Sequence, residues 1–141
     1  MKKPNALFWI LGVVFLLWNA FGCVIYIIDK AASDAQYAEM YGEAMLATRD
    51  VYPLWATAAY AIAVWGGLLA AIFLLLRKRH AAPLFVASLI GAVISFIPVF
   101  TESAFKEASG STYWVMPIIV VLLGLFEVWW SRRARANGIL N

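Results

Sequence analysis

The chain has 141 residues, of which 65% are apolar and 13% are charged, and its formal net charge is +3. Soluble domains carry about 25% charged residues, so this composition excludes an ordinary water-soluble globular protein. The positive charge does not indicate a nucleic-acid partner, because the basic residues gather in short clusters beside apolar segments rather than along one face. The single cysteine, Cys23, excludes an intrachain disulfide.

Four long apolar segments occupy residues 6–28, 54–76, 81–100 and 113–130. A helix needs about 20 mostly apolar residues to cross a bilayer, and the first three segments reach that length without an acidic or basic residue. The first segment is longer than the apolar part of a signal peptide, so we expect it to be retained. The sequence therefore predicts an all-α integral membrane protein, with residues 1–141 forming a single transmembrane domain.

The charged residues around these segments predict the orientation. Eight of the eleven basic residues lie at one side of the predicted spans, at positions 2–3, 77–79 and 132–135. Because basic residues mark the cytoplasmic side, we expect both termini in the cytoplasm of a bacterial cell and the protein in its inner membrane. The short connection at 77–80 makes the second and third spans antiparallel neighbours, which indicates an up-down four-helix bundle.

The long connection between the first two spans predicts a helix of its own. Ser33 and Gln36 have the spacing of a capping box, in which each side chain satisfies a free N–H group at a helix start. One face of the following segment is apolar and aromatic at helical spacing, and the opposite face carries Glu39 and Glu43. We therefore expect a short extracytoplasmic amphipathic helix over residues 34–48 that lies on the bundle or on the lipid headgroups. Gly42 is the one residue in it that disfavours a helix.

Each span carries one stripe of small or polar side chains. Such residues turn toward other helices, because lipid tails offer them neither hydrogen bonds nor close packing. The four stripes, in chain order, are Gly12, Asn19, Gly22 and Tyr26; Thr57, Tyr60, Val64, Gly67 and Ala71; Ser88, Gly91, Ser95, Pro98 and Glu102; and Tyr113, Pro117, Val120, Gly124 and Glu127. Sorted by depth, they predict a polar vestibule that opens to the outside and narrows over Asn19.

The candidate ligand-binding residues are the polar stripe members from the midplane outward. They are Asn19, Tyr26, Thr57, Tyr60, Ser95, Glu102 and Tyr113. Two interpretations of Asn19 stand side by side, an interhelical hydrogen bond that fixes packing and an amide that contacts a ligand, and packing is the commoner role. The aromatic residues near the outer surface similarly fit an interfacial belt better than a ligand site.

Glu127 is the only acidic residue inside a predicted span. One interpretation is that its carboxylate extends toward the cytoplasmic arginines Arg132, Arg77 or Arg79, and we expect this pairing. The other is a proton-linked or ion-linked role, since acidic residues inside a membrane are functional candidates. The sequence contains no Ser/His/Asp set, phosphate-binding loop, paired carboxylates or metal-ligand cluster. We therefore expect neither an enzyme nor a bound cofactor or metal.

Several segments resemble a group of small bacterial four-span membrane proteins, some of which are labelled sugar transporters. They are Pro-Asn-Ala-Leu-Phe-Trp-Ile at 4–10, Leu-Trp-Asn-Ala-Phe-Gly at 17–22, Pro-Leu-Trp-Ala-Thr-Ala at 53–58 and Leu-Leu-Leu-Arg-Lys at 74–78. The resemblance covers about the first hundred residues and implies transport of a sugar-like solute.

Two hypotheses follow. The first is a bundle in the lipid bilayer, assembled as a homo-oligomer, that binds or passes a small polar or amphipathic solute. The second is an accessory or scaffold subunit that packs against a larger membrane partner.

Overall fold

The computed structural model describes residues 2–141, and its regular elements are all helical. Four helices are long, α1 (Ala6–Ala31), α4 (Leu54–Leu75), α5 (Ala81–Thr101) and α7 (Val115–Ala136). Each is long and apolar enough to cross a membrane. The structure thus confirms the predicted all-α class and the four apolar helices, and it indicates a multi-pass membrane protein.

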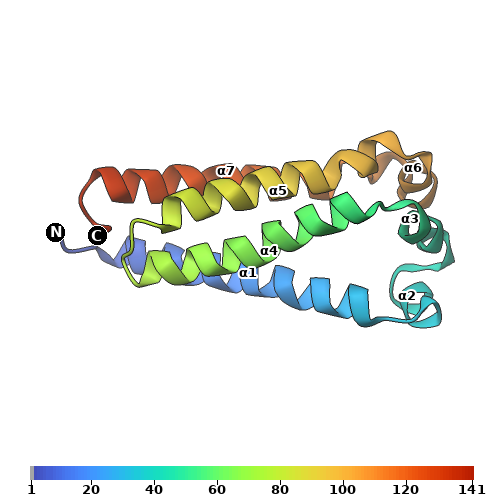
Figure 1. The fold of residues 1–141 in the computed structure, drawn as a ribbon, viewed down its shortest axis with the longest axis horizontal. Coiled ribbons are helices and arrows are strands. Elements are labelled where there is room, and N and C mark those ends of the chain that lie inside the picture. The colour runs from blue at the N-terminus through green and yellow to red at the C-terminus, as the bar shows by residue number, and fades with distance from the viewer. Residues whose placement is uncertain (1) are drawn as a thin grey trace.

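The long helices lie side by side, and both termini are found at the same end of the molecule (Figure 1). Along this array α1 packs on α4, α4 on α5, and α5 on α7. The short helices α2 (Asp34–Tyr41), α3 (Leu46–Val51) and α6 (Ser103–Ser109) cover the opposite end. We call these two ends the termini end and the cap end.

Local sequence signals set where the helices begin. The side chain of Asn5 accepts a hydrogen bond of 3.0 Å from the Phe8 backbone N–H at the start of α1. At the start of α2, Ser33 and Gln36 form both hydrogen bonds of a capping box, as the sequence predicted. These two helix starts are therefore determined by side chains that lie next to them in the chain.

The predicted helix over residues 34–48 is interrupted. Helix α2 ends at Tyr41, a 3₁₀ turn follows over Glu43–Met45, and only then does α3 begin. The break lies at Gly42, whose φ of 93° is a conformation that only glycine adopts without strain. The prediction of one continuous helix was wrong because Gly42 lets the chain turn there. Helix α6, in the second connection of the cap end, was not predicted.

The core of the molecule lies at the termini end. Phe8, Phe15, Leu74 and Phe85 are buried there in one apolar cluster with small residues and with Leu140 of the chain's tail. The Phe15 ring meets the Phe85 ring edge-on, with ring centroids 6.0 Å apart. These contacts fill the space between the four helices at this end.

The C-terminal tail is bound to the turn between α4 and α5. The Asn141 N–H donates to the Arg77 carbonyl at 2.7 Å, and the Arg79 N–H donates to the Asn141 carbonyl at 2.8 Å. The Lys2 N–H donates to the Gly138 carbonyl at 3.0 Å. Both termini are thereby fixed against the closed core.

Candidate functional site

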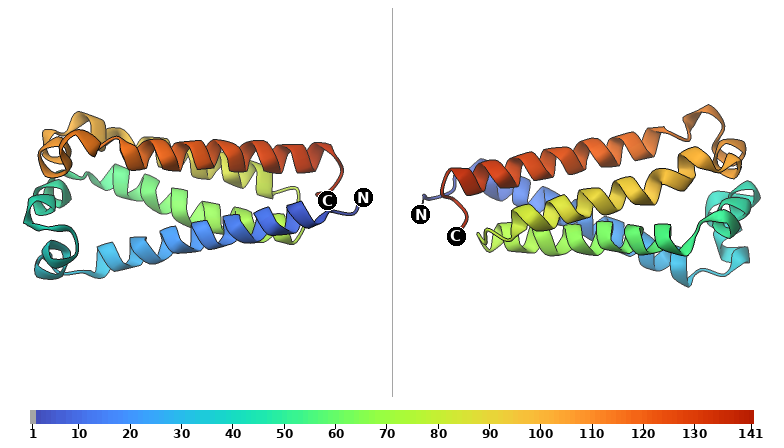
Figure 2. Two further views of the ribbon diagram at one scale, coloured as in Figure 1. Left: turned by 180° about the vertical axis from the view of Figure 1, so that it is seen from behind. Right: turned by 45° about the horizontal axis from the view of Figure 1, so that its top comes forward.

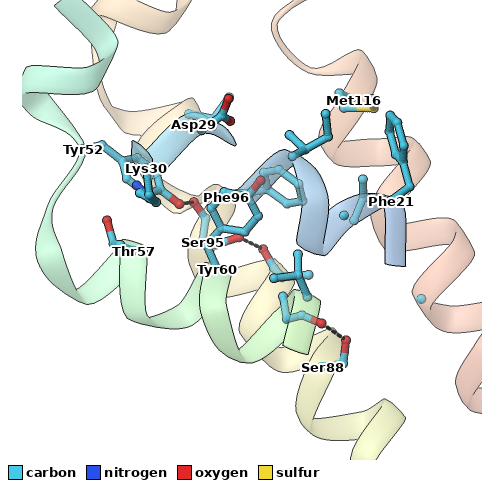
Figure 3. A pocket seen from close by; sticks show the side chains of 18 of the residues that line it. Phe21, Asp29, Lys30, Tyr52, Thr57, Tyr60, Ser88, Ser95, Phe96 and Met116 are labelled. Atoms are coloured by element: carbon cyan, nitrogen blue, oxygen red, sulfur yellow. Dashed lines mark hydrogen bonds between the residues drawn. The ribbon is translucent and has the colours of Figure 1, made fainter. Parts of the chain in front are cut away.

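A cavity of about 670 Å³ lies between the long helices and extends from the cap end into the bundle. It exists because α1 and α7 diverge toward the cap end, which both views of Figure 2 show. All four long helices and the cap segments contribute to its wall, and Figure 3 shows the side chains of most of its lining residues.

The inner end of the cavity is formed by Asn19 of α1 and Glu127 of α7. The Asn19 amide nitrogen donates to the Glu127 carboxylate at 2.7 Å and to the Phe15 carbonyl at 2.8 Å. Both side chains line the cavity although their residues are only 7% and 4% exposed. A polar pair is thus held deep inside an apolar bundle, at the boundary between the cavity and the closed core.

The expected pairing of Glu127 with Arg132, Arg77 or Arg79 was wrong. The carboxylate turns into the bundle, where the amide of α1 offers it a donor. In residues 2–141 the only ion pair joins Arg49 to Asp34, at 3.2 Å. Glu127 is therefore a buried acid whose partner is neutral.

Two small residues allow α4 and α5 to approach the Asn19 side chain. A Cβ atom added at Gly67 would collide with the Asn19 amide oxygen and would lie 3.0 Å from Ser88 Oγ. Only glycine leaves room for Asn19 at this point of α4. Ser88 of α5 donates to the Ala63 carbonyl at 2.6 Å, so its hydroxyl joins α5 to α4 beside the same residues.

Aromatic side chains surround the cavity closer to the cap end. The Tyr26 and Tyr60 rings meet edge-on, with centroids 5.0 Å apart. The Lys30 ammonium lies 5.5 Å from the centroid of the Tyr52 ring and 5.9 Å from that of Tyr26. The Tyr52 hydroxyl donates to the Ser95 carbonyl at 2.8 Å, and burial raises the pKa of this phenol to about 12. Tyr52 therefore remains a protonated donor at neutral pH.

The cap is fastened to the end of α1. Arg49 donates to the carbonyls of Asp29 and Ala32 at 3.1 and 2.6 Å, so its guanidinium satisfies free carbonyl groups where α1 ends. The Tyr41 hydroxyl donates to the Asp29 carboxylate at 2.6 Å. Burial, together with this bond, raises the pKa of the Tyr41 phenol. These contacts hold α2 and α3 over the cap end.

The structure brings together most of the residues that the sequence singled out. Asn19, Thr57, Tyr60, Ser95 and Glu127 line the one cavity. The inward stripes are confirmed as well, because of all their members only Glu102 is exposed.

Three of the candidate ligand-binding residues do not line the cavity. Tyr26 packs against the Tyr60 and Trp65 rings. Glu102 is exposed at the C-cap of α5, because the helix ends there. Tyr113 lies against the Phe100 ring, and the Lys106 ammonium is 5.2 Å from its centroid.

Comparisons with protein-family models, with curated proteins and with solved structures gave no match. The role of the cavity therefore rests on its own geometry.

The cap contributes lining residues that the sequence did not single out as a site. They are Tyr37, Tyr41, Met45, Thr48, Arg49 and Tyr52, with Asp29 and Lys30 from the end of α1. The signal that could have found the first four is the apolar face of the segment 34–48, which was interpreted as a surface for lipid or bundle contact. The cap segments thus form part of the cavity wall, which continues into the connection between α1 and α4.

The arrangement suits binding. The wall combines aromatic and aliphatic side chains with a few hydroxyl groups and, at the inner end, an amide and a carboxyl. Residues 2–141 contain no group of three or more His, Cys, Asp or Glu that could hold a metal ion. The polar groups at the inner end offer a solute one donor-acceptor side chain and one acid.

Proposed function

We propose that the chain is a membrane protein that binds, and passes across the bilayer, a small polar or amphipathic solute. Ligand sites are typically concave, of about 300–1,000 Å³, largely apolar and supplied with a few convergent polar groups. The cavity of about 670 Å³ has these properties. The observation that carries the proposal is the buried Asn19–Glu127 pair at its inner end.

The proposed orientation places the cap end outside the cytoplasm and both termini inside, in an up-down bundle of the bacterial inner membrane. Eight basic residues lie at the termini end, whereas seven acidic and three basic residues lie at the cap end. Basic residues resist translocation, which supports this orientation. Reporter fusions at both ends that are active only in the cytoplasm would support it, and a reporter active on the outer side would contradict it.

A sugar-like solute and a homo-oligomer belong to the same proposal. The sugar follows from the resemblance of the first hundred residues to small membrane proteins labelled sugar transporters. The cavity is built by a single chain, so a second copy is not required for binding. The mass of the purified particle tests the oligomer.

Solute binding by the purified protein in nanodiscs tests the function. A panel of glucose, maltose and small organic cations, alcohols and acids is measured by equilibrium dialysis against empty nanodiscs. We expect saturable binding of at least one of these solutes, weakened in Asn19→Leu and in Tyr60→Phe. Absence of saturable binding by every member of the panel would contradict the proposal.

An accessory subunit is the second candidate function. The observation that favours it is the exposure of five tryptophans on the outer surface. Trp9, Trp55, Trp65, Trp114 and Trp129 are each 42% to 52% exposed. Such side chains are common at protein interfaces, although interfacial lipid also accommodates them. Purification in mild detergent separates the two functions, because an accessory subunit brings a constant partner with it.

A further inference from the structure

We propose that the solute is an organic cation whose protonated amine pairs with the Glu127 carboxylate at the inner end of the cavity. This inference rests on the proposed solute-binding function and replaces the sugar-like solute, which follows only from the resemblance, with an organic cation. Four features of the structure carry it: the acid without an ion-pair partner, the acidic excess of the cap end, the tyrosine rings near that end, and the apolar opening between α1 and α7.

The first feature is the electrostatic state of Glu127. A carboxylate in a membrane bundle needs a proton or a nearby cation, because the surroundings do not solvate its charge. Asn19 supplies one hydrogen bond and no charge. No basic side chain in residues 2–141 forms an ion pair with Glu127. A protonated amine that enters the cavity would supply the missing charge and further hydrogen bonds.

The second feature is the charge of the cap end as a whole. The cap end carries Asp29, Asp34, Glu39, Glu43, Asp50, Glu102 and Glu107, against the three bases Lys30, Arg49 and Lys106. Arg49 is already engaged by Asp34 and by two backbone carbonyls. An excess of one sign around a cleft raises the local concentration of the opposite ion and its rate of association. Of the charged side chains at this end, only Asp29, Lys30 and Arg49 line the cavity. The acidic excess of the cap end as a whole therefore favours the approach of cations over that of anions.

The third feature is the set of tyrosine rings near the cap end, of which Tyr52 and Tyr60 line the cavity and Tyr26 packs against Tyr60. The Lys30 ammonium lies over the Tyr52 and Tyr26 rings, so these rings already accept an alkylammonium group of the chain itself. Figure 3 shows Tyr52, Lys30, Thr57 and Tyr60 along one side of the cavity. Aromatic faces attract ammonium groups more strongly when the pair is removed from water. A solute amine could thus exchange with Lys30 at the mouth before it reaches Glu127.

The fourth feature decides between an organic and an inorganic cation. Phe21 of α1 and Met116 of α7 both line the cavity where these helices diverge, and each is 58% exposed. A bare metal ion would gain nothing from this apolar wall and would require several oxygen ligands. An amine attached to an apolar body matches both the wall and the acid.

The test uses three probes of similar size that differ in charge: phenethylammonium, 2-phenylethanol and phenylacetate. Binding to the full chain in phosphatidylglycerol nanodiscs is measured by equilibrium dialysis, with empty nanodiscs as background. We expect saturable binding of phenethylammonium, at least tenfold tighter than that of either other probe. Glu127→Gln should weaken it at least tenfold. Glu107→Gln, which removes one of the seven acids of the cap end, should change it less than twofold because Glu107 is exposed and does not line the cavity.

The outcomes separate the solute class from the proposed function. Saturable binding of phenylethanol, glucose or phenylacetate without a preference for phenethylammonium would overturn the cation while leaving a binding protein. Equal phenethylammonium binding by a well-folded Glu127→Gln variant would also overturn it. The probe comparison needs no variant and remains decisive if Glu127→Gln fails to fold. The measurement is repeated in nanodiscs that contain phosphatidylethanolamine. Weaker binding of phenethylammonium in these nanodiscs would show that the lipid headgroup competes for the site and is the source of the ammonium group.

Discussion

The two ends of the bundle differ in what fills the space between the helices. At the termini end, phenylalanine rings and the chain's own tail occupy it, whereas at the cap end the helices separate around a cavity. The same four helices thus form a closed half and an open half. The difference teaches that the packed core and the cavity lie at separate ends of the bundle, with the Asn19–Glu127 pair at the boundary.

The largest expected effect contrasts two phenylalanines of α5. Phe85 is 2% exposed within the closed core, so Phe85→Ala should lower the free energy of unfolding by about 3 kcal/mol through the cavity it leaves. Phe96 already borders the open cavity, so Phe96→Ala should cost about 1 kcal/mol or less. Thermal unfolding in detergent measures both. Equal losses would contradict the division into a closed and an open half.

The second prediction concerns the close packing of α5 on α4, two helices that run through both halves of the bundle. A Cβ atom at Gly91 would lie 2.8 Å from the Ala59 carbonyl oxygen and 3.0 Å from the Ala63 nitrogen, both of them backbone atoms that cannot rotate away. Gly91→Ala should therefore destabilise the fold by about 2 kcal/mol. Gly66→Ala is the matched control, because the nearest atom there is 3.9 Å away. A Gly91→Ala protein as stable as Gly66→Ala would show that the helices are not packed this closely.

A smaller effect is expected at the boundary. Asn19→Leu removes the one side-chain hydrogen bond that Glu127 makes within residues 2–141, and it should cost about 1 kcal/mol, within the range measured for such bonds in membranes. Thr57→Val is the control, since the Thr57 hydroxyl also lines the cavity but bonds only to Pro53 of its own helix end. The two variants should differ in denaturation by a graded detergent mixture. A more stable Asn19→Leu protein would mean that the pair is not formed.

The smallest effect concerns the cap. The pKa of Tyr52 is raised to about 12 and that of Tyr41 is raised as well, so the unfolded chain, with phenols near pH 10, loses these protons first. The stabilisation is therefore complete below about pH 10 and decreases as the pH rises toward 12. The protection factors of the α2 and α3 amides, which correct for the base-catalysed intrinsic exchange rate, should decrease over that interval, while those of the termini end change little. Tyr52→Phe should reduce the effect, and unchanged protection factors in the cap would contradict the two hydrogen bonds.

Much of the fold could be predicted because the relevant signals are local. The four apolar segments, the capping box at Ser33 and the inward stripes each follow from residues a few positions apart. The bond between Asn19 and Glu127 could not be predicted in the same way, because it joins residues 108 positions apart. Whether the two side chains meet depends on the position of α7 relative to α1 along the bundle axis. Residue numbers alone give that relative position only approximately.

The cap shows the opposite limit. The apolar face of residues 34–48 could be recognised from the sequence, but what it contacts could not. An apolar helix face fits lipid, a neighbouring helix or a cavity equally well. Gly42 decided the outcome by turning the chain, so that Tyr37 and Thr48 border the cavity from separate elements. A single glycine thus changed both the secondary structure and the composition of the site.

Thiol labelling of two serine-to-cysteine variants tests the division into an open and a closed half most directly. In a Cys23→Ala background, Ser88→Cys places a thiol in the cavity wall, and Ser131→Cys places one in α7 toward the termini end, where the serine is 0% exposed. A charged, membrane-impermeant methanethiosulfonate reagent is added to the protein in nanodiscs. The structure predicts rapid labelling of Ser88→Cys and none of Ser131→Cys in the folded protein. Equal labelling of the two, or labelling of Ser131→Cys alone, would contradict an open half at the cap end and a closed half at the termini end.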